Sequence, residues 1–295
     1  MPQSPTVAFI GLGIMGLPMA ANLVSAGFTV RGYDRAPQQT DRFAGKGGTA
    51  ASSLAEAVDG AGVVITMVPD SPDVDEAMFA TGGVFDSAAS GTLVIDMSTI
   101  RPDTARTVAE EGRIRGLRVL DAPVSGGETG AVEGVLSIMV GGDSADFHAA
   151  ADVFAPLGTA VPVGPAGAGQ TVKAANQLIV AGNIQLVAEA LVFLEAHGVD
   201  TEAGLRVLNG GLAGSTVLTR KGEAMRHRRF EPGFRIGLHD KDMGIVTAAA
   251  REAGVPVPTG ALVAQFIGAL KAQGHGGLDH SALLALLDRI ATEQK

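Results

Sequence analysis

The chain has 295 residues, of which 46% are hydrophobic, 18% charged and 4% aromatic. This length accommodates about two domains of ordinary size, and the composition excludes an intrinsically disordered protein. The formal net charge of −9 argues against nucleic acid as a partner, and the absence of cysteine excludes disulfides and a catalytic thiol.

The N-terminal segment predicts no secretory signal peptide, because residues 1–5 carry no basic side chain. We therefore expect a cytoplasmic protein. The most apolar long stretch, residues 174–196, contains Asn, Gln and Glu side chains that a bilayer would leave unsatisfied. It predicts a buried helix of a soluble fold and no membrane partner. The histidines show no spacing typical of metal ligands, so no metal is expected.

Short β-branched runs alternate with helical stretches through the first half of the chain. The predicted strands are residues 7–10, 29–33, 63–68, 93–95, 118–120 and 136–140. Most of them are hydrophobic at nearly every position, which is typical of parallel strands covered on both faces. The pattern predicts an α/β fold of the Rossmann type, a doubly wound parallel sheet with crossover helices such as 17–26 and 104–115.

Helical periods replace the strand signals after the Pro- and Gly-rich segment 162–167. We therefore expect a dinucleotide-binding domain at 1–165 and an all-helical substrate and oligomerisation domain at 166–295. The mean hydropathy of +0.27 indicates that some helix surface is buried between subunits, so we expect a homodimer or homotetramer.

A GxGxxG motif formed by Gly11, Gly13 and Gly16 follows the first predicted strand and opens a helix. These glycines allow a tight turn, close approach of a pyrophosphate, and packing of helix on strand. Asp34 ends the second strand about 20 residues later, where such folds place the acid that binds the ribose. This context favours a dinucleotide site over an ordinary glycine-rich turn. The predicted cofactor contacts in this region are Gly11, Leu12, Gly13, Ile14, Met15, Gly16, Asp34 and Arg35.

Asp34 and Arg35 bear on which nicotinamide cofactor is used. A carboxylate at the ribose repels a 2′-phosphate, so Asp34 favours NAD. Arg35 leaves NADP possible, because a guanidinium there could hold a phosphate or stack on adenine. The alternative for Arg35 is a plain surface residue, and the pattern does not decide between the two.

Two further motifs carry polar groups. In the string 121–127, Ser125, Gly126 and Gly127 could form a concave donor site for a carboxylate, although Ser-Gly pairs more often mark a simple turn. In the string 167–177, Lys173 shares a helix face with polar residues three and four positions later. The helix dipole would ease loss of a proton from such a lysine. A lysine that extends to water is an equally good alternative.

Four parts of the sequence resemble the four signature blocks of the β-hydroxyacid dehydrogenase family, over essentially the whole chain. They are the strings 11–23, 121–127 and 167–177, and Lys241-Asp242. The resemblance implies an NAD(P)-dependent oxidoreductase in which Lys173 is the catalytic acid or base. It implies that Ser125, Gly126 and Gly127 bind the carboxylate of a small substrate.

The same resemblance implies roles for other positions. Asn176 and Gln177 would contact substrate, although many relatives carry asparagine at 177. Asp242 would face substrate and Lys241 the cofactor, whereas a surface ion pair is the alternative for these two. The expected lining of the nicotinamide side is Met67, Val68, Pro69 and Thr99.

Segments 210–218, 232–236 and 279–283 resemble the family branch that reduces tartronate semialdehyde to glycerate more than the branch that acts on 3-hydroxyisobutyrate. We therefore expect reduction of that semialdehyde. The alternatives are another 3-hydroxy acid as substrate and, more remotely, a non-catalytic cofactor-binding module.

Overall fold

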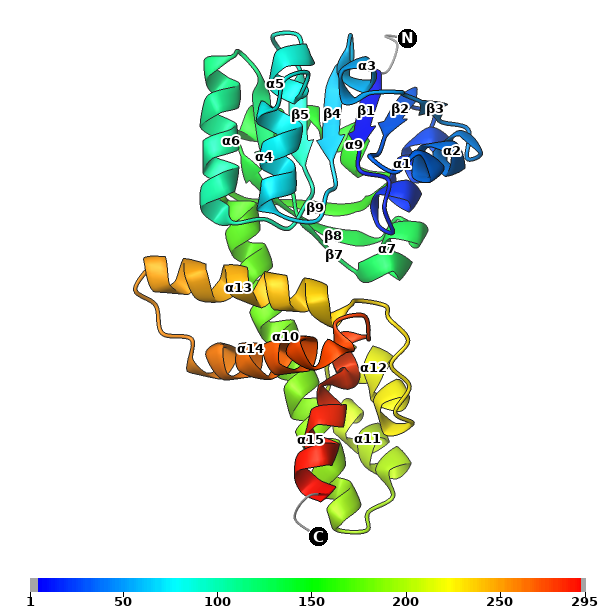
Figure 1. The fold of residues 1–295 in the computed structure, drawn as a ribbon, viewed down its shortest axis with the longest axis vertical. Helices are drawn as coiled ribbons and strands as arrows, with labels where there is room; N and C mark the ends of the chain where they lie inside the picture. Colours follow the sequence, from blue (N-terminus) through cyan, green and yellow to red (C-terminus); the bar gives the residue numbers. More distant parts are fainter. Residues whose placement is uncertain (1–4, 293–295) are drawn as a thin grey trace. The chain divides into compact units, whose positions relative to one another are not determined.

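The computed structural model describes residues 5–292 (Figure 1). The chain divides into two compact units, Met1–Lys173 and Ala174–Lys295. The first unit is built around a sheet and the second around helices, which confirms the predicted fold class.

Within the described residues, the first unit contains one sheet of nine strands in the order β3-β2-β1-β4-β5-β6-β8-β7, with β9 beside β8. The strands are β1 (Val7–Ile10), β2 (Val30–Tyr33), β3 (Thr49–Ala50), β4 (Val63–Thr66), β5 (Leu93–Asp96), β6 (Arg118–Asp121), β7 (Val124–Ser125), β8 (Leu136–Gly142) and β9 (Gly158–Gly164). All pairs from β3 to β6 along this order are parallel. The strand order changes direction at β1, which is where such sheets bind ligands.

The structure departs from the predicted sheet at one side. All six predicted strands are present, but β8 runs antiparallel to β6, so the expectation of a wholly parallel sheet is wrong there. The chain turns back through β7 before it enters β8, and β7 also pairs with β8 in antiparallel fashion. An antiparallel edge on a mainly parallel sheet is common in doubly wound folds.

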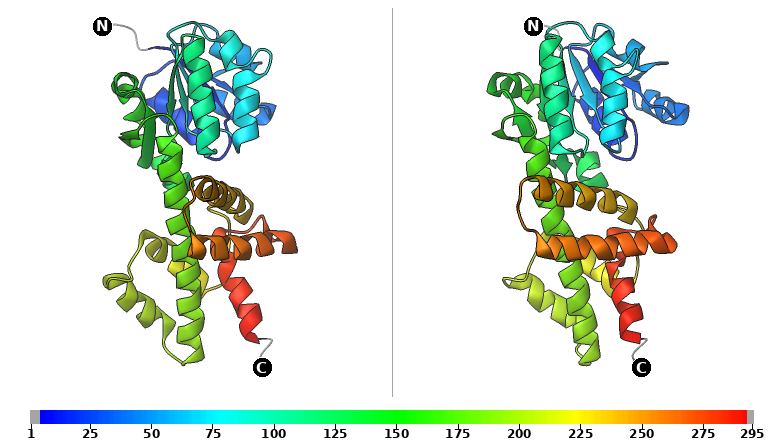
Figure 2. Two further views of the ribbon diagram at one scale, coloured as in Figure 1. Left: turned by 90° about the vertical axis from the view of Figure 1, so that its left-hand side faces the viewer. Right: turned by 60° about the vertical axis from the view of Figure 1, so that its left-hand side comes forward.

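Helices cover both faces of this sheet (Figure 2). Alternate side chains of β1 point to opposite faces of the sheet: Val7 and Phe9 belong to one buried cluster, and Ala8 and Ile10 belong to another. Because both faces are covered, every position of the strand needs a hydrophobic residue. The helices of this unit are α1 (Gly16–Ser25), α2 (Pro37–Ala44), α3 (Leu54–Val58), α4 (Ser71–Phe79), α5 (Val84–Ser87), α6 (Pro102–Ile114), α7 (Gly127–Glu133), α8 (Ser144–Ala149) and α9 (Ala151–Phe154).

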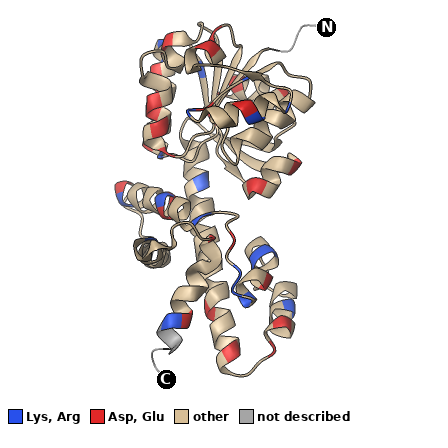
Figure 3. Cartoon of the chain, turned by 45° about the vertical axis from the view of Figure 1, so that its right-hand side comes forward, with Lys and Arg blue, Asp and Glu red and all other residues tan. Residues whose placement is uncertain are grey.

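The second unit is helical. Helix α10 (Ala168–Ala196) begins in the first unit and continues into the second. It is followed by α11 (Thr201–Gly210), α12 (Thr216–Arg226), α13 (Ile236–Glu252), α14 (Pro258–Leu270), the π-helical turn η1 (Lys271–His275), the 3-10 turn η2 (His280–Ala282) and α15 (Leu283–Thr292). Acidic and basic residues are interspersed along the helices of each unit (Figure 3). One such group ties α15 to α10, because Arg228 forms ion pairs with Glu195 and Asp288.

Helix α10 is the one helix of residues 5–292 with the length and hydropathy to cross a membrane, a test that core helices also pass. Ile184 and Leu191 on one face are fully buried in the core of the second unit. Ile179, Leu186 and Phe193 on another face are 62%, 59% and 63% exposed. Within a single chain, the predicted burial of this helix therefore holds for the first face and not for the second.

Two histidines form a buried polar cluster in the second unit. His239 on α13 and His280 in η2 approach each other with their Nδ1 atoms 3.1 Å apart. The neighbouring Asp279 accepts a hydrogen bond from the Lys221 ammonium at 2.7 Å. Across residues 5–292, no group of three or more His, Asp or Glu side chains is placed to hold a metal ion. Through the contacts above, the cluster joins α12, α13 and η2 to one another.

Candidate functional site

The glycine-rich loop 11–16 connects β1 to α1 at the carboxyl edge of the sheet. A Cβ atom at Gly11 would collide with the carbonyl oxygen of Met67, and one at Gly16 with the carbonyl oxygen of Gly11. Gly11 also has a φ of +93°, which other residues rarely adopt. At Gly13, in contrast, no atom of the chain lies within 4 Å of such a Cβ. Packing within the protein therefore does not require glycine at position 13. A bound pyrophosphate does, because it lies against the backbone in front of the helix N-terminus, where a side chain would block it.

Asp34 is fixed beside this loop. Its Oδ2 accepts a hydrogen bond from the N–H of Leu12 at 2.7 Å, and its Oδ1 accepts one from the N–H of Ala36 at 2.8 Å. A carboxylate retains acceptor capacity after two such bonds, so ribose hydroxyls can still bind. The Leu12 side chain is fully buried, whereas Ile14 is exposed and Met15 packs at the margin of the core. Leu12 can therefore face a cofactor through its backbone alone.

The segments after β4 and β5 lie at the same edge of the sheet. The N–H of Val68 donates to the hydroxyl of Ser98 at 2.9 Å, which fixes Met67 to Pro69 against the residue that precedes Thr99. Thr99 is half-buried and Pro69 is exposed. The structure thus brings the four residues predicted to line the nicotinamide together.

Lys173 lies against the turn that contains Ser125. Its Nζ donates a hydrogen bond to the carbonyl oxygen of Val124 at 2.8 Å, and the residue is only 7% exposed. The ammonium is therefore not extended into water. Gly126 and Gly127 have φ values of +142° and +66°, so the turn after Ser125 requires glycine at both positions. The structure places the predicted acid or base next to the predicted carboxylate site.

Asp121, to which the sequence analysis gives no role of its own, holds the start of α10. Its two carboxylate oxygens accept the backbone N–H groups of Gly167 at 2.7 Å and Gln170 at 2.9 Å. Burial raises the pKa of Asp121 to about 6, while the two N–H groups favour its charged form. The residue stands in a recognised motif, but its partners lie 46 and 49 positions later, which local spacing cannot show.

Gln170 is the second residue that sequence reasoning missed. Its side-chain amide donates to the carbonyl oxygen of Ser98 at 2.8 Å and accepts from the N–H of Ile100 at 3.0 Å. These two bonds bracket Thr99. Because Lys173 follows Gln170 by three residues on the same helix, they also fix the rotation of the helix that carries the lysine.

A buried polar network in the second unit joins four predicted residues. Gln177 donates to Asp242 and accepts from Asn176 at 2.7 Å, and Lys241 lies 2.9 Å from Asp242. The side chains of Asp242 and Lys241 are 2% and 16% exposed, so a surface ion pair is the wrong description. Removing Asp242 or Lys241 would leave the charge of the other residue uncompensated in the interior. Gln177 is held by Asp242 and accepts the hydrogen bond of the Asn176 amide, so the network orients Asn176 through Gln177.

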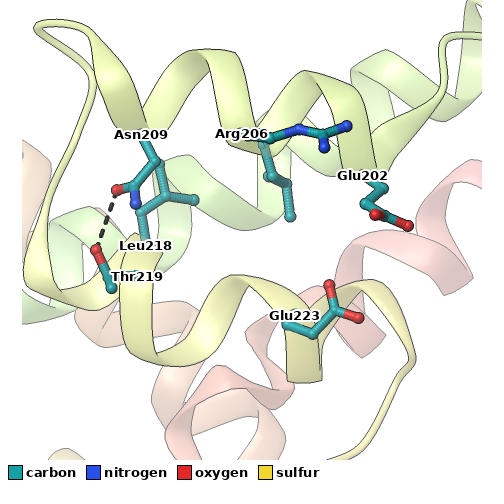
Figure 4. A pocket seen from close by; sticks show the side chains of 7 residues that line it. Glu202, Arg206, Asn209, Leu218, Thr219 and Glu223 are labelled. Carbon is teal, nitrogen blue, oxygen red and sulfur yellow. Dashed lines mark hydrogen bonds between the residues drawn. The ribbon is translucent and has the colours of Figure 1, made fainter.

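A surface pocket of the second unit lies between α11 and α12 (Figure 4). Its lining residues are Glu202, Leu205, Arg206, Asn209, Leu218, Thr219 and Glu223. The hydroxyl of Thr219 donates to Asn209 at 3.1 Å, and Arg226 donates to Glu223. The pocket contains none of the predicted site residues, and its polar groups are largely paired within the protein.

The glycine loop before a helix, the acid after β2 and the change of strand order at β1 define a Rossmann-type dinucleotide-binding protein. Residues 6–164 match the family model described as the NAD binding domain of 6-phosphogluconate dehydrogenase. Residues 167–287 match the model described as NAD-binding of NADP-dependent 3-hydroxyisobutyrate dehydrogenase. Both halves of the chain therefore match families of nicotinamide-dependent dehydrogenases.

Relatives match nearly the full length. The 2-hydroxy-3-oxopropionate reductase of Escherichia coli is 40% identical over 289 residues, which cover 98% of this chain and 99% of that protein. The NAD-dependent L-serine dehydrogenase of Pseudomonas aeruginosa is 36% identical over 96% of this chain and 97% of that protein. A structure of Mycobacterium tuberculosis 3-hydroxyisobutyrate dehydrogenase with L-serine has a TM-score of 0.88 at 36% identity, covering 96% of this chain and 99% of that one. The chain belongs to the β-hydroxyacid dehydrogenase family and is an oxidoreductase that binds NAD(P), as its signature blocks predict.

Proposed function

We propose that this enzyme reduces tartronate semialdehyde, also called 2-hydroxy-3-oxopropionate, to glycerate. The 40% identity to a reductase of that name over nearly the full length supports this substrate. The observation that carries the chemistry is the hydrogen bond from Lys173 to the carbonyl oxygen of Val124, which holds an ammonium beside the Ser125 turn.

In the proposed mechanism, the hydroxyl of Ser125 and the N–H groups of Gly126 and Gly127 bind the substrate carboxylate. A reduced nicotinamide cofactor, once bound, would supply the hydride for the aldehyde carbon and would itself become oxidised. Lys173 donates a proton to the former carbonyl oxygen, so that the aldehyde becomes a primary alcohol. In the reverse direction the neutral amine of Lys173 accepts that proton.

The roles proposed for the second unit rest on the family resemblance. Asn176, Gln177 and Asp242 would contact or orient substrate, and Lys241 would reach the cofactor. The hydrogen bond from Gln177 to Asp242 supports an orienting role for Gln177 rather than direct substrate contact.

Oxidation of a 3-hydroxy acid is the second candidate. It is favoured by two relatives of 36% identity, one named an L-serine dehydrogenase and one a 3-hydroxyisobutyrate dehydrogenase solved with L-serine. The acid-base role of Lys173 is the same in both cases. The substrates differ only in the group on the carbon next to the carboxylate, which is a hydroxyl, an amino or a methyl group.

Initial rates with a panel of substrates test the proposal. Tartronate semialdehyde and methylmalonate semialdehyde are reduced with NADH and with NADPH, while glycerate, L-serine and 3-hydroxyisobutyrate are oxidised with NAD. We expect the highest kcat/KM for tartronate semialdehyde among the aldehydes and for glycerate among the alcohols. An equal or higher kcat/KM for methylmalonate semialdehyde or L-serine contradicts the proposed substrate.

We also propose that the protein is a homodimer or homotetramer, assembled through the exposed apolar face of α10. Ile179, Leu186 and Phe193 recur at intervals of seven residues, the repeat of two helices that pack along each other. A second copy of the chain presents the same stripe and is the simplest partner for it.

A further inference from the structure

Arg35, which the sequence leaves open as a phosphate ligand, is held by two carboxylates of α4. Its guanidinium lies 2.5 Å from Asp73 and 3.0 Å from Glu76. Asp73 and Glu76 are three positions apart, so they project from the same side of the helix. Both carboxylates therefore converge on one guanidinium.

This arrangement is anchored on both sides. Arg35 follows Asp34, whose carboxylate is fixed by the N–H groups of Leu12 and Ala36. Asp73 lies in the first turn of α4, where the helix dipole favours a negative charge. An isolated exposed ion pair is weak. Here one guanidinium bridges two carboxylates, one of which is stabilised by the end of its own helix.

The charges in this group oppose a 2′-phosphate. A free arginine beside the ribose would bind that phosphate through parallel N–H donors. In this protein the donors of Arg35 already face Asp73 and Glu76. Two carboxylates pair with this one guanidinium, and Asp34 adds a third negative charge nearby, so a phosphate dianion meets an excess of negative charge.

We propose that Asp73 and Glu76 are specificity-determining residues, which make the enzyme prefer NAD(H) to NADP(H) by holding Arg35 away from the 2′ position of the ribose. Asp34 disfavours the phosphate directly, and the α4 carboxylates withdraw the cation that would otherwise offset it. The inference rests on the dinucleotide binding that the family establishes and not on the proposed substrate.

Binding of the two reduced cofactors tests this inference without substrate. The chain has no tryptophan, so the fluorescence of the nicotinamide itself reports binding, with isothermal titration calorimetry as a second measurement. In the double variant Asp73→Asn/Glu76→Gln we expect the Kd for NADPH to fall by about three- to tenfold, as expected for release of exposed ion pairs. The Kd for NADH should change by less than about twofold.

Two controls make the result specific. Asp75→Asn removes one negative charge from the same helix, but Asp75 is not one of the carboxylates that bind Arg35, so the ratio of the two Kd values should stay at the wild-type value. Arg35→Ala removes the one positive charge of this group, so it should not lower the Kd for NADPH in the otherwise wild-type protein, and it should abolish the gain when added to the double variant.

Three results would overturn the inference. The double variant could keep the wild-type ratio, the gain could survive Arg35→Ala, or the wild-type protein could bind NADPH as tightly as NADH. A substrate panel that contradicts tartronate semialdehyde leaves these Kd values untouched, so the two proposals fail independently.

Discussion

Among single residues, Lys173 has the role on which the proposed chemistry depends. The change Lys173→Ala removes the proton donor and the hydrogen bond to Val124. We expect kcat to fall by about 10²–10⁴-fold, the usual contribution of a positioned acid or base. The Kd for NADH should stay close to the wild-type value, because the glycine loop and Asp34 bind the nucleotide. Stopped-flow rates and fluorescence titration measure the two quantities.

Lys46→Ala is the matched control, since Lys46 is exposed and lies in the first unit. Its kcat should equal that of the wild type. A Lys173→Ala protein with near-normal kcat would falsify the acid-base role. A variant that loses both cofactor binding and turnover would instead show that the lysine maintains the fold of the site.

Local spacing was sufficient to indicate some of the candidate site residues and insufficient for others. The glycines at 11, 13 and 16 and the lysine at 173 stand in short patterns whose geometry follows from a turn or a helix. The residue that anchors that lysine does not, because Gln170 binds a residue 72 positions away. The same holds for Arg35, which binds a carboxylate 38 positions away. Such pairs depend on the packed sheet, which a single sequence does not specify residue by residue.

At the scale of elements, the strands found from sequence have at least four residues, nearly all of them buried or half-buried. The missed strands are β3 and β7, which have two residues each, and β9, which contains Pro162 and mostly exposed side chains. Their hydrogen bonds come from neighbours in the sheet and leave little hydrophobic pattern. The direction of β8 was also missed, because a strand's direction depends on the strands it pairs with and not on its own hydrophobic pattern.

The contact between η2 and α13 gives the protein a predicted pH dependence. Burial, reinforced by the neighbouring His239, lowers the pKa of His280 below its ordinary 6.5. Below pH 6.5 the unfolded chain therefore binds a proton that the folded chain does not. The contribution of His280 to the unfolding free energy is complete above pH 6.5 and is lost as the pH falls, with a limiting slope of about 1.4 kcal/mol per pH unit for one proton.

Urea unfolding between pH 7.5 and pH 5 measures this slope. His280→Asn should make the dependence on pH shallower, whereas His197→Asn, at an exposed histidine, should not. Asp121 acts in the opposite direction, because its raised pKa of about 6 means that its contribution falls as pH rises from 3.8 to 6. That contribution is common to all three proteins and cancels in the comparison. Equal slopes for the wild type and His280→Asn would contradict the prediction.

For the whole molecule, the exposed stripe of α10 is the surface through which we propose that subunits assemble. The sequence predicts burial of this helix from its hydropathy, and one chain supplies partners for only part of it. Ile184 and Leu191 are covered within the second unit, whereas Leu186 between them is 59% exposed. Hydropathy indicates how much apolar surface needs a partner but does not say whether the same chain provides it.

Leu186→Asp tests assembly at the centre of this stripe. Burying each large apolar side chain contributes roughly 1.5–3 kcal/mol, and a carboxylate there reverses that contribution and adds a desolvation cost. We expect sedimentation equilibrium to show a wild-type mass above the 29.8 kDa of one chain and a smaller mass for Leu186→Asp. Val207→Asp on α11, 75% exposed and not part of the stripe, should keep the wild-type mass. A monomeric wild type, or a Leu186→Asp protein of unchanged mass, means that α10 does not form the subunit contact.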